Sequence, residues 1–181
     1  MSNYRVAVRY ARSLFELSVE QKKLEEVKID MEMLYTLCIQ NKAFRNFLKN
    51  PIIHSYKKLS ILSKILEKKV DDLTFKFVDI VTRKSREDII PEISEQFLVQ
   101  YRQFKRIEIV DVITPIKLDQ TLKAEFEKLA KNYIQKDWIV EINEKVDKEL
   151  IGGYVVKIGD RQIDDSVSSK LREVRKQLIV S

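Results

Sequence analysis

The stretch Val-Asp-Lys-Glu-Leu-Ile-Gly-Gly-Tyr-Val-Val-Lys-Ile-Gly-Asp, residues 146–160, contains every glycine of this 181-residue chain. Glycine carries no Cβ atom, so it tolerates a left-handed backbone and the close approach of another chain segment. Three glycines within eight positions therefore indicate one demanding local geometry. We expect close backbone approach at Gly152 and Gly153 and a positive φ at Gly159.

The residues on either side of Gly159 predict a strand, a turn and a helix. Apolar side chains alternate over residues 154–158, as in a strand with one buried face, and Gly159-Asp160 is a typical turn pair. Ser166 or Asp165 has the side-chain oxygen that caps a helix N-terminus. The helix itself is indicated by apolar residues spaced four, three and four apart, namely Val167, Leu171, Val174 and Leu178.

Composition and charge indicate a globular chain of two domains. Hydrophobic residues make up 44% of the chain and charged residues 34%, which is typical of a protein that buries a core. The net charge of +6 lies entirely in residues 1–105, which hold 20 Lys and Arg against 14 Asp and Glu, while residues 106–181 hold 14 of each. A β-branched run at residues 107–113 follows this change. We therefore expect domains at 1–105 and 106–181.

The first domain is predicted to be a six-helix bundle. Ser55 and Asp71 are expected caps, Pro51 separates two helices, and Pro91 fits the first turn of the last helix. Apolar residues at helical spacing predict helices near 4–20, 22–40, 42–49, 55–68, 71–84 and 87–105.

The second domain is predicted to be a small α+β domain with a β-hairpin and a terminal helix. The long helix in its middle has one apolar face that would cover a sheet, formed by Leu118, Leu122, Phe126, Leu129 and Tyr133. The expected order is strand 107–113, helix 118–135, strand 138–146, strand 150–158 and helix 166–179. The fold class of the whole chain is α+β.

The chain offers few residues for catalysis or for a metal. Its single cysteine, Cys38, lies on an apolar helical stripe and is expected in the core, and its single histidine, His54, is expected in an exposed turn. The carboxylates of Asp160, Asp164 and Asp165 lack the order of a calcium-binding loop, so we expect turn and cap roles for them. We predict no catalytic residue, no metal and no cofactor.

No apolar run approaches the roughly 20 residues that span a bilayer. Residues 1–17 contain three arginines and lack the continuous apolar core of a signal peptide. We therefore expect the protein to remain in the compartment where it is made.

The glycine-rich segment resembles the C-terminal signature of the delta subunit of F-type ATP synthases, the family that includes the oligomycin-sensitivity-conferring protein. The order V-D-x-x-L-I-G-G-x-x-x-x-I-G-D-x-x-x-D-x-S-x-x-x-x-L is matched at Val146, Asp147, Leu150, Ile151, Gly152, Gly153, Ile158, Gly159, Asp160, Asp164, Ser166 and Leu171.

Two further segments extend this resemblance over nearly the whole chain. Residues 9–18, Arg-Tyr-Ala-Arg-Ser-Leu-Phe-Glu-Leu-Ser, are similar to the family's opening helix R-Y-A-x-A-L-F-E-L-A, with Ser13 and Ser18 in place of alanines. Residues 86–97 resemble the pattern R-L-x-x-L-P-x-I-x-x-x-F, with Glu87 and Ile90 as departures.

The resemblance implies a non-catalytic stator connector. In this family the N-terminal domain sits on the catalytic head of α and β subunits, and the C-terminal domain grips the b subunits of the peripheral stalk. The head then cannot turn with the rotor, so proton-driven rotation is coupled to ATP synthesis. We accordingly expect a protein peripheral to a bacterial cell membrane, on its cytoplasmic side and held there through the complex, with no small-molecule ligand.

Two predicted helices have apolar faces wider than one core contact needs. The face spans about 200° on helix 4–20 and about 220° on helix 71–84, so both helices could be central in the bundle, and that interpretation stays open. The resemblance implies instead a groove between the first and fifth helices that binds the N-terminal helix of an α subunit. Its residues would be Ala7, Tyr10, Ala11, Leu14, Phe15, Phe77, Val78 and Val81, and its rim Arg5, Arg9 and Arg12.

The alternative is a basic helical protein that binds nucleic acid. Pairs at Lys22-Lys23, Lys57-Lys58 and Lys68-Lys69 could neutralise phosphates. They lie on different predicted helices beside acidic residues and in no known binding motif, which is more typical of a solvated surface. The glycines match neither the dinucleotide-binding nor the P-loop pattern. We therefore expect no nucleic acid among the partners.

Overall fold

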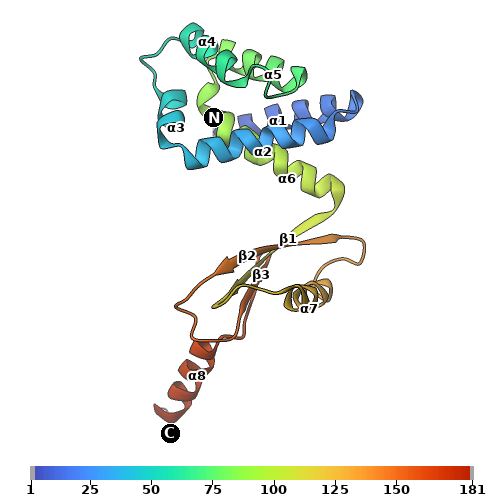
Figure 1. Ribbon diagram of the computed structural model, residues 1–181, viewed down its shortest axis with the longest axis vertical. Helices are drawn as coiled ribbons and strands as arrows, with labels where there is room; N and C mark the ends of the chain where they lie inside the picture. Colours follow the sequence, from blue (N-terminus) through green and yellow to red (C-terminus); the bar gives the residue numbers. More distant parts are fainter. Residues whose placement is uncertain (1–2, 180–181) are drawn as a thin grey trace. The chain divides into compact units, whose positions relative to one another are not determined.

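The computed structural model describes residues 3–179 and shows a mixed fold of helices and one sheet (Figure 1). The chain separates into two compact units between Tyr101 and Arg102. In the described residues, unit 1 is helical, and unit 2 combines a sheet with helices. Helix α6 (Ile90–Lys105) runs across the boundary and ends at Lys105, because the next residue, Arg106, has a φ of 56° that a right-handed helix cannot continue.

Unit 1 begins with five helices and a short 3-10 helix, η1. Their bounds are α1 (Asn3–Glu20), α2 (Leu24–Gln40), α3 (Lys42–Lys49), α4 (Ser55–Leu66), α5 (Asp72–Arg83) and η1 (Glu87–Ile89). The predicted helix at 87–105 is thus two elements, η1 and α6. Pro91 has no N–H to give the carbonyl of Glu87, which accepts instead from Ile90 in the tighter 3-10 geometry.

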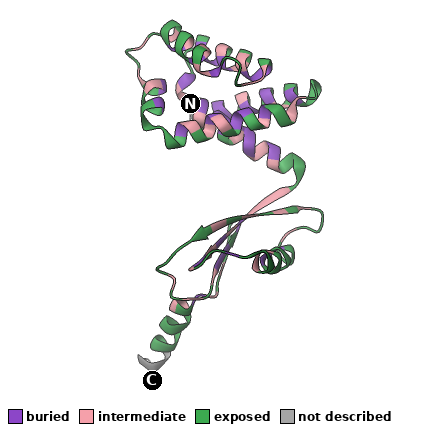
Figure 2. Cartoon of the chain, viewed as in Figure 1, coloured by how far each residue is buried: buried purple, intermediate pink, exposed green. Residues whose placement is uncertain are grey.

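The apolar sides of these helices form the core of unit 1 (Figure 2). Complete burial of a large apolar side chain stabilises a fold by about 1.5–3 kcal/mol relative to exposure. The largest completely buried side chains of unit 1 are Phe97, Leu14, Met31, Leu34, Leu48, Leu66 and Ile93.

Asp71 caps α5, and the expected cap at Ser55 is wrong. The N–H of Leu73 donates to Asp71 Oδ1 at 2.8 Å, while Lys23 Nζ lies 2.7 Å from Asp71 Oδ2. The hydrogen bond from Lys23 lowers the pKa of the Asp71 carboxyl. Ser55 is instead the first residue of α4, and His54 precedes it without a side-chain cap bond. The Ser55 hydroxyl bonds with that of Ser85 at 3.0 Å instead.

Unit 2 is built around a four-stranded sheet in the order β2-β1-β3-β4. Its strands are β1 (Ile107–Thr114), β2 (Ile139–Val146), β3 (Val155–Ile158) and β4 (Arg161–Asp164). β1 pairs with β2 in parallel over eight residues and with β3 antiparallel, and β3 and β4 form an antiparallel hairpin. The parallel pair requires a long crossover connection, which contains α7 (Gln120–Lys131).

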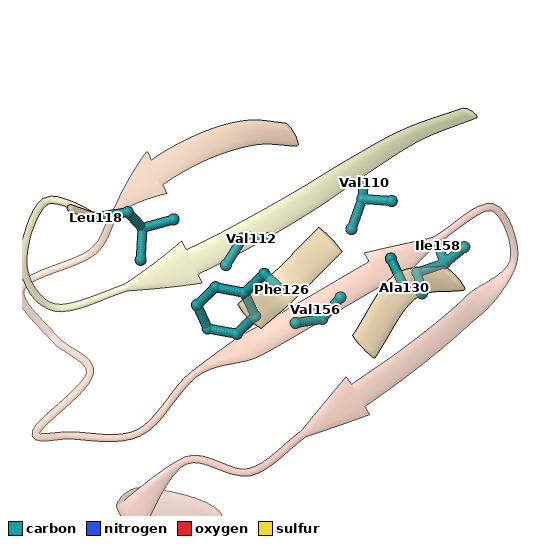
Figure 3. Packing of buried hydrophobic residues seen from close by; sticks show 7 residues of the cluster. All are labelled: Val110, Val112, Leu118, Phe126, Ala130, Val156 and Ile158. Carbon is teal, nitrogen blue, oxygen red and sulfur yellow. The ribbon is translucent and has the colours of Figure 1, made fainter. Parts of the chain in front are cut away.

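Helix α7 supplies Phe126 to the core of unit 2 (Figure 3). The Phe126 ring meets the Tyr154 ring edge to face at 5.1 Å. The helix begins later than predicted because Asp119 caps it, accepting from the N–H of Leu122 at 2.7 Å. It also ends earlier, at Lys131, so Tyr133 lies beyond the helix and is half exposed. The buried residues of this core are Val110, Val112, Leu118, Phe126, Ala130, Val156 and Ile158.

The structure adds a strand to the predicted order. The hairpin turns at Gly159-Asp160, and its second arm is β4, which no expected element covered. The predicted strand 150–158 begins only at Val155, because the chain turns through Gly152 and Gly153. The terminal helix α8 (Val167–Ile179) follows β4 after two residues, and the side chain of Leu178 lies outside the described part.

Candidate functional site

The glycine-rich segment joins the sheet to the start of α8. Gly153 has φ 79°, and a Cβ atom there would lie 2.3 Å from the carbonyl oxygen of Asp165. The carbonyl of Gly152 accepts from the N–H of Val167 at 3.0 Å. Gly159 has φ 53°, and a Cβ atom there would make only an ordinary contact, 3.5 Å from Glu108 Oε1. Gly153 thus permits close backbone contact at the base of α8, whereas a Cβ atom at Gly152 would approach the Val167 side chain, and Gly159 permits the hairpin turn.

Asp164 and Ser166 organise the first turn of α8. Ser166 Oγ accepts from the N–H of Ser169 at 3.2 Å, and Asp164 accepts from the Ser166 N–H and the Ser169 hydroxyl at 3.0 and 2.8 Å. Hydrogen bonds from Ser166, followed by that from Ser169, lower the pKa of the Asp164 carboxyl. Asp165 pairs with Lys170 at 2.7 Å, and Asp160 is exposed at the hairpin turn. These carboxylates serve turns and helix ends.

The apolar stripe of α8 is open to solvent. Val167, Leu171 and Val174 are 37%, 56% and 52% exposed, and every described side chain from Lys170 to Lys176 is exposed (Figure 2). Ile151, just before the base of the helix, is 75% exposed. This surface of unit 2 is therefore available to another protein.

Most of the predicted groove residues belong to the core of unit 1. The half-buried ones are Tyr10, Phe15 and Phe77. Phe15 packs on Phe97 with ring centroids 5.8 Å apart. Five of the eight are buried, namely Ala7, Ala11, Leu14, Val78 and Val81. The wide apolar faces of α1 and α5 thus reflect packing within unit 1 to a large extent.

A narrower apolar surface remains where α1 and α5 meet. The rings of Tyr10 and Phe77 are in edge contact at 6.3 Å, and Ile80, one turn along α5 from Phe77, is 52% exposed. We call these three residues the α1–α5 surface. Ile80 was not among the predicted groove residues.

The predicted rim arginines differ in their surroundings. Arg5, Arg9 and Arg12 are all exposed, and Arg12 Nε pairs with Glu16 Oε1 at 2.8 Å. Arg9 lines a hollow of about 310 Å³ together with Arg86, which was not among the predicted rim residues. Three residues of α1, namely Val6, Tyr10 and Ser13, complete its wall.

The single cysteine and the single histidine of the chain lie in different surroundings. Cys38 is buried, and this burial raises the pKa of its thiol to about 11, which disfavours the reactive thiolate. His54 is exposed and stacks on Tyr56. Across residues 3–179 no three or more His, Cys, Asp or Glu side chains gather as metal ligands would.

Among the helices that the structure describes, none combines the length and the apolar character needed to cross a membrane.

One buried ion pair was not predicted. Lys58 Nζ donates to Glu87 Oε1 and to the carbonyl of Leu48, both at 2.7 Å, and the two charged side chains are 4% and 7% exposed. The pair ties α4 to η1 and to the end of α3. Lys58 is thus removed from the basic surface that the nucleic-acid interpretation requires.

The sequence matches the family described as the ATP synthase delta (OSCP) subunit over residues 6–178, which include both units. It is 37% identical to the ATP synthase subunit delta of Cytophaga hutchinsonii, over 97% of this chain and 94% of that protein. It is 32% identical to the ATP synthase subunit delta of Amoebophilus asiaticus, over 99% of this chain and 97% of that protein.

The fold is also found in a solved complex. A chain of the mitochondrial ATP synthase hexamer of Toxoplasma gondii superposes with a TM-score of 0.70. The superposition covers 96% of this chain and 97% of that one, at 20% sequence identity, so the likeness concerns the fold.

Proposed function

Because the chain belongs to the ATP synthase delta (OSCP) subunit family, we propose that its two units hold two different parts of the enzyme. The chain is a non-catalytic component of the peripheral stalk, in the stator of the ATP synthase. The comparisons give no support to the nucleic-acid alternative. The match over residues 6–178 carries the proposal, because it includes a helical unit and a sheet-containing unit, each with apolar surface left over.

Unit 1, whose helices we take to form the six-helix bundle, is the end that binds the catalytic head. Its ligand is the N-terminal helix of an α subunit, which would lie along the α1–α5 surface. Tyr10, Phe77 and Ile80 supply the apolar anchors that a helix in a groove requires. The buried residues Ala7 and Ala11 would support this contact from below rather than touch the ligand.

Unit 2 is the end that binds the b subunits of the peripheral stalk. Its contact surface is α8, whose Val167, Leu171 and Val174 form a stripe that no described residue covers. A 13-residue helix is marginal alone in water, so covering this stripe would stabilise α8 as well as the complex.

A chain with one binding surface on each unit can hold the catalytic head against rotation without catalysing a reaction. The head experiences torque at each catalytic step, and a contact that released it would let the rotor slip. Nanomolar affinity corresponds to about 12 kcal/mol of binding free energy, which a few buried anchors within a polar rim can supply.

The protein belongs to a membrane-associated complex. In our proposal it is peripheral to a bacterial cell membrane, on the cytoplasmic side, and is held there by its protein partners.

Add-back to membranes tests the coupling function. ATP synthase assembled without this chain should hydrolyse ATP while pumping few protons, and adding the purified protein should restore pumping. The assay follows proton uptake by inverted vesicles together with ATP hydrolysis. Full coupling in vesicles that lack the chain would contradict the proposal.

Two substitutions test the assignment of the units. Phe77→Asp should weaken binding of a peptide that copies the N-terminus of the α subunits and leave binding of a C-terminal fragment of the b subunits unchanged, whereas Leu171→Asp should do the opposite. Lys76→Asp and Arg172→Asp, at exposed neighbouring positions, are the matched controls. If either variant lost binding of both the α-subunit peptide and the b-subunit fragment, the assignment of one ligand to each unit would be wrong.

A further inference from the structure

The hollow between Arg9 and Arg86 differs from the rest of the arginine-rich edge of unit 1. Two neighbouring arginines already have partners, since Arg12 pairs with Glu16 and Arg83 with Asp79, both at 2.8 Å. Within the part of the chain that the structure describes, the guanidinium groups of Arg9 and Arg86 make no ion pair. Their charges therefore remain available to a ligand.

Two arginines that line one hollow create a positive potential in it. Val6 is buried, and Tyr10 is half buried against Phe77, so apolar groups form part of the wall. Apolar walls exclude water from one side and strengthen the attraction of an anion. A guanidinium fork also matches the two oxygens of a carboxylate.

Ser13 adds no donor of its own. Its hydroxyl donates to the carbonyl of Arg9 at 3.0 Å, so this hydrogen is already committed. The positively charged groups that can bind an anion in the hollow are those of Arg9 and Arg86.

The hollow adjoins the α1–α5 surface, because Tyr10 belongs to both. A ligand that fills both must carry a negative charge beside apolar side chains. An amphipathic helix with a carboxylate at the edge of its apolar face has this pattern.

We propose that Arg9 and Arg86 clamp one Asp or Glu side chain of the partner helix that lies on the α1–α5 surface. The inference rests on the proposed function of unit 1 and adds a charge requirement to it. The clamp sets the position of the helix along the surface, while Tyr10, Phe77 and Ile80 supply the apolar contact.

The test uses the full-length protein and a labelled peptide copying the N-terminal segment of the cognate α subunit. Arg9→Glu and Arg86→Glu should each weaken peptide binding about tenfold or more, as expected when a charge-assisted pair is replaced by repulsion. Arg12→Glu is the matched control, because it makes the same charge change on α1 outside the hollow. It should change the affinity less than about threefold.

A charge swap identifies the ligand group. Each Asp or Glu of the peptide is replaced in turn by Lys, and one replacement should weaken binding to the wild-type protein and restore binding to the Arg86→Glu variant. Melting curves of the variants, expected to match the wild type because both arginines are exposed, verify that the fold is intact.

The possible failures are distinguishable. Wild-type affinity in both Arg9→Glu and Arg86→Glu, or an equal loss in Arg12→Glu, would overturn the clamp and leave the helix-binding function standing. Absence of peptide binding to the wild-type protein would overturn the proposed function of unit 1 and the clamp with it.

Discussion

Helices α1 and α8 both carry apolar residues at helical spacing, but the protein buries a stripe of α1 and leaves that of α8 exposed. Ala7, Ala11 and Leu14 are at most 1% exposed, whereas Leu171 and Val174 are more than half exposed. The wide apolar face of α1 indicates a central position in unit 1. The narrow stripe of α8, which looks ordinary in the sequence, is exposed at Val167, Leu171 and Val174.

The difference shows that the width of an apolar face does not identify a binding surface. A wide apolar face allows a helix to pack against several other elements. How many elements actually pack against it depends on the fold. In α1 the neighbours are present and leave Tyr10 at the edge. In α8 no described residue buries the stripe, which is why we propose it as the contact with the peripheral stalk.

The largest effect should come from placing a charge on each helix. Ala11→Asp buries a carboxylate without a partner and should destabilise unit 1 by about 3–5 kcal/mol, while Leu171→Asp, on an exposed surface, should change stability by less than about 0.5 kcal/mol. Denaturant unfolding followed by circular dichroism measures both. Equal destabilisation by the two variants would show that α8 packs on its own chain.

The next effect concerns the base of α8. Gly153→Ala forces a Cβ atom into the backbone of Asp165 and a side chain onto a positive φ, and should destabilise unit 2 by about 3 kcal/mol. Gly159→Ala has the same type of φ, but its Cβ atom would make only an ordinary contact, 3.5 Å from Glu108 Oε1, so it should cost only about 1–2 kcal/mol. The fluorescence of the single tryptophan, Trp138 in unit 2, reports unfolding. Equal costs would mean that contact with Asp165 is unimportant.

A smaller effect is expected at the cap of α8. Ser166→Ala removes the acceptor for the N–H of Ser169 and should cost about 1 kcal/mol. Faster amide hydrogen exchange in the first turn of α8, with unchanged exchange in α1, is the expected observation. Ser168→Ala, at the neighbouring helical position, serves as the control and should alter neither helix.

The smallest effect is a pH dependence confined to α8. Because folding lowers the pKa of Asp164, its stabilising contribution is present above the unfolded pKa of about 3.9 and disappears as the pH falls through the lower folded value. Amide hydrogen exchange in the first turn of α8 should therefore become faster below about pH 4. In the Asp164→Asn variant this pH-dependent acceleration should be absent. The same pH response in the variant would assign it to another group.

Local backbone conformation could be predicted from the sequence where it depends on residue type. Gly159 in a turn pair predicts a positive φ, and Asp71 before an apolar helical pattern predicts a cap. Ser55 misled because a serine at a helix start can cap the helix or lie within its first turn, and the sequence alone does not distinguish the two. β4 was missed because only Ile163 among its four residues is apolar, so it shows no alternation.

The surfaces were less predictable because they join residues distant in the sequence. Arg86 lies 77 positions after Arg9, and only the fold brings both to one hollow. The burial of Ala7 and Ala11 likewise depends on which helices cover α1. A helical pattern predicts which face of the helix a side chain lies on, but not which other residues pack against it.

The inner place of β1 in the sheet has a mechanical consequence. The strand follows α6 directly and has β2 on one side and β3 on the other, so tension arriving along the chain from unit 1 enters a strand bonded along both edges. Force applied along a strand shears its whole ladder at once instead of peeling it bond by bond. We therefore expect unit 2 to resist unfolding most strongly when force is applied along β1.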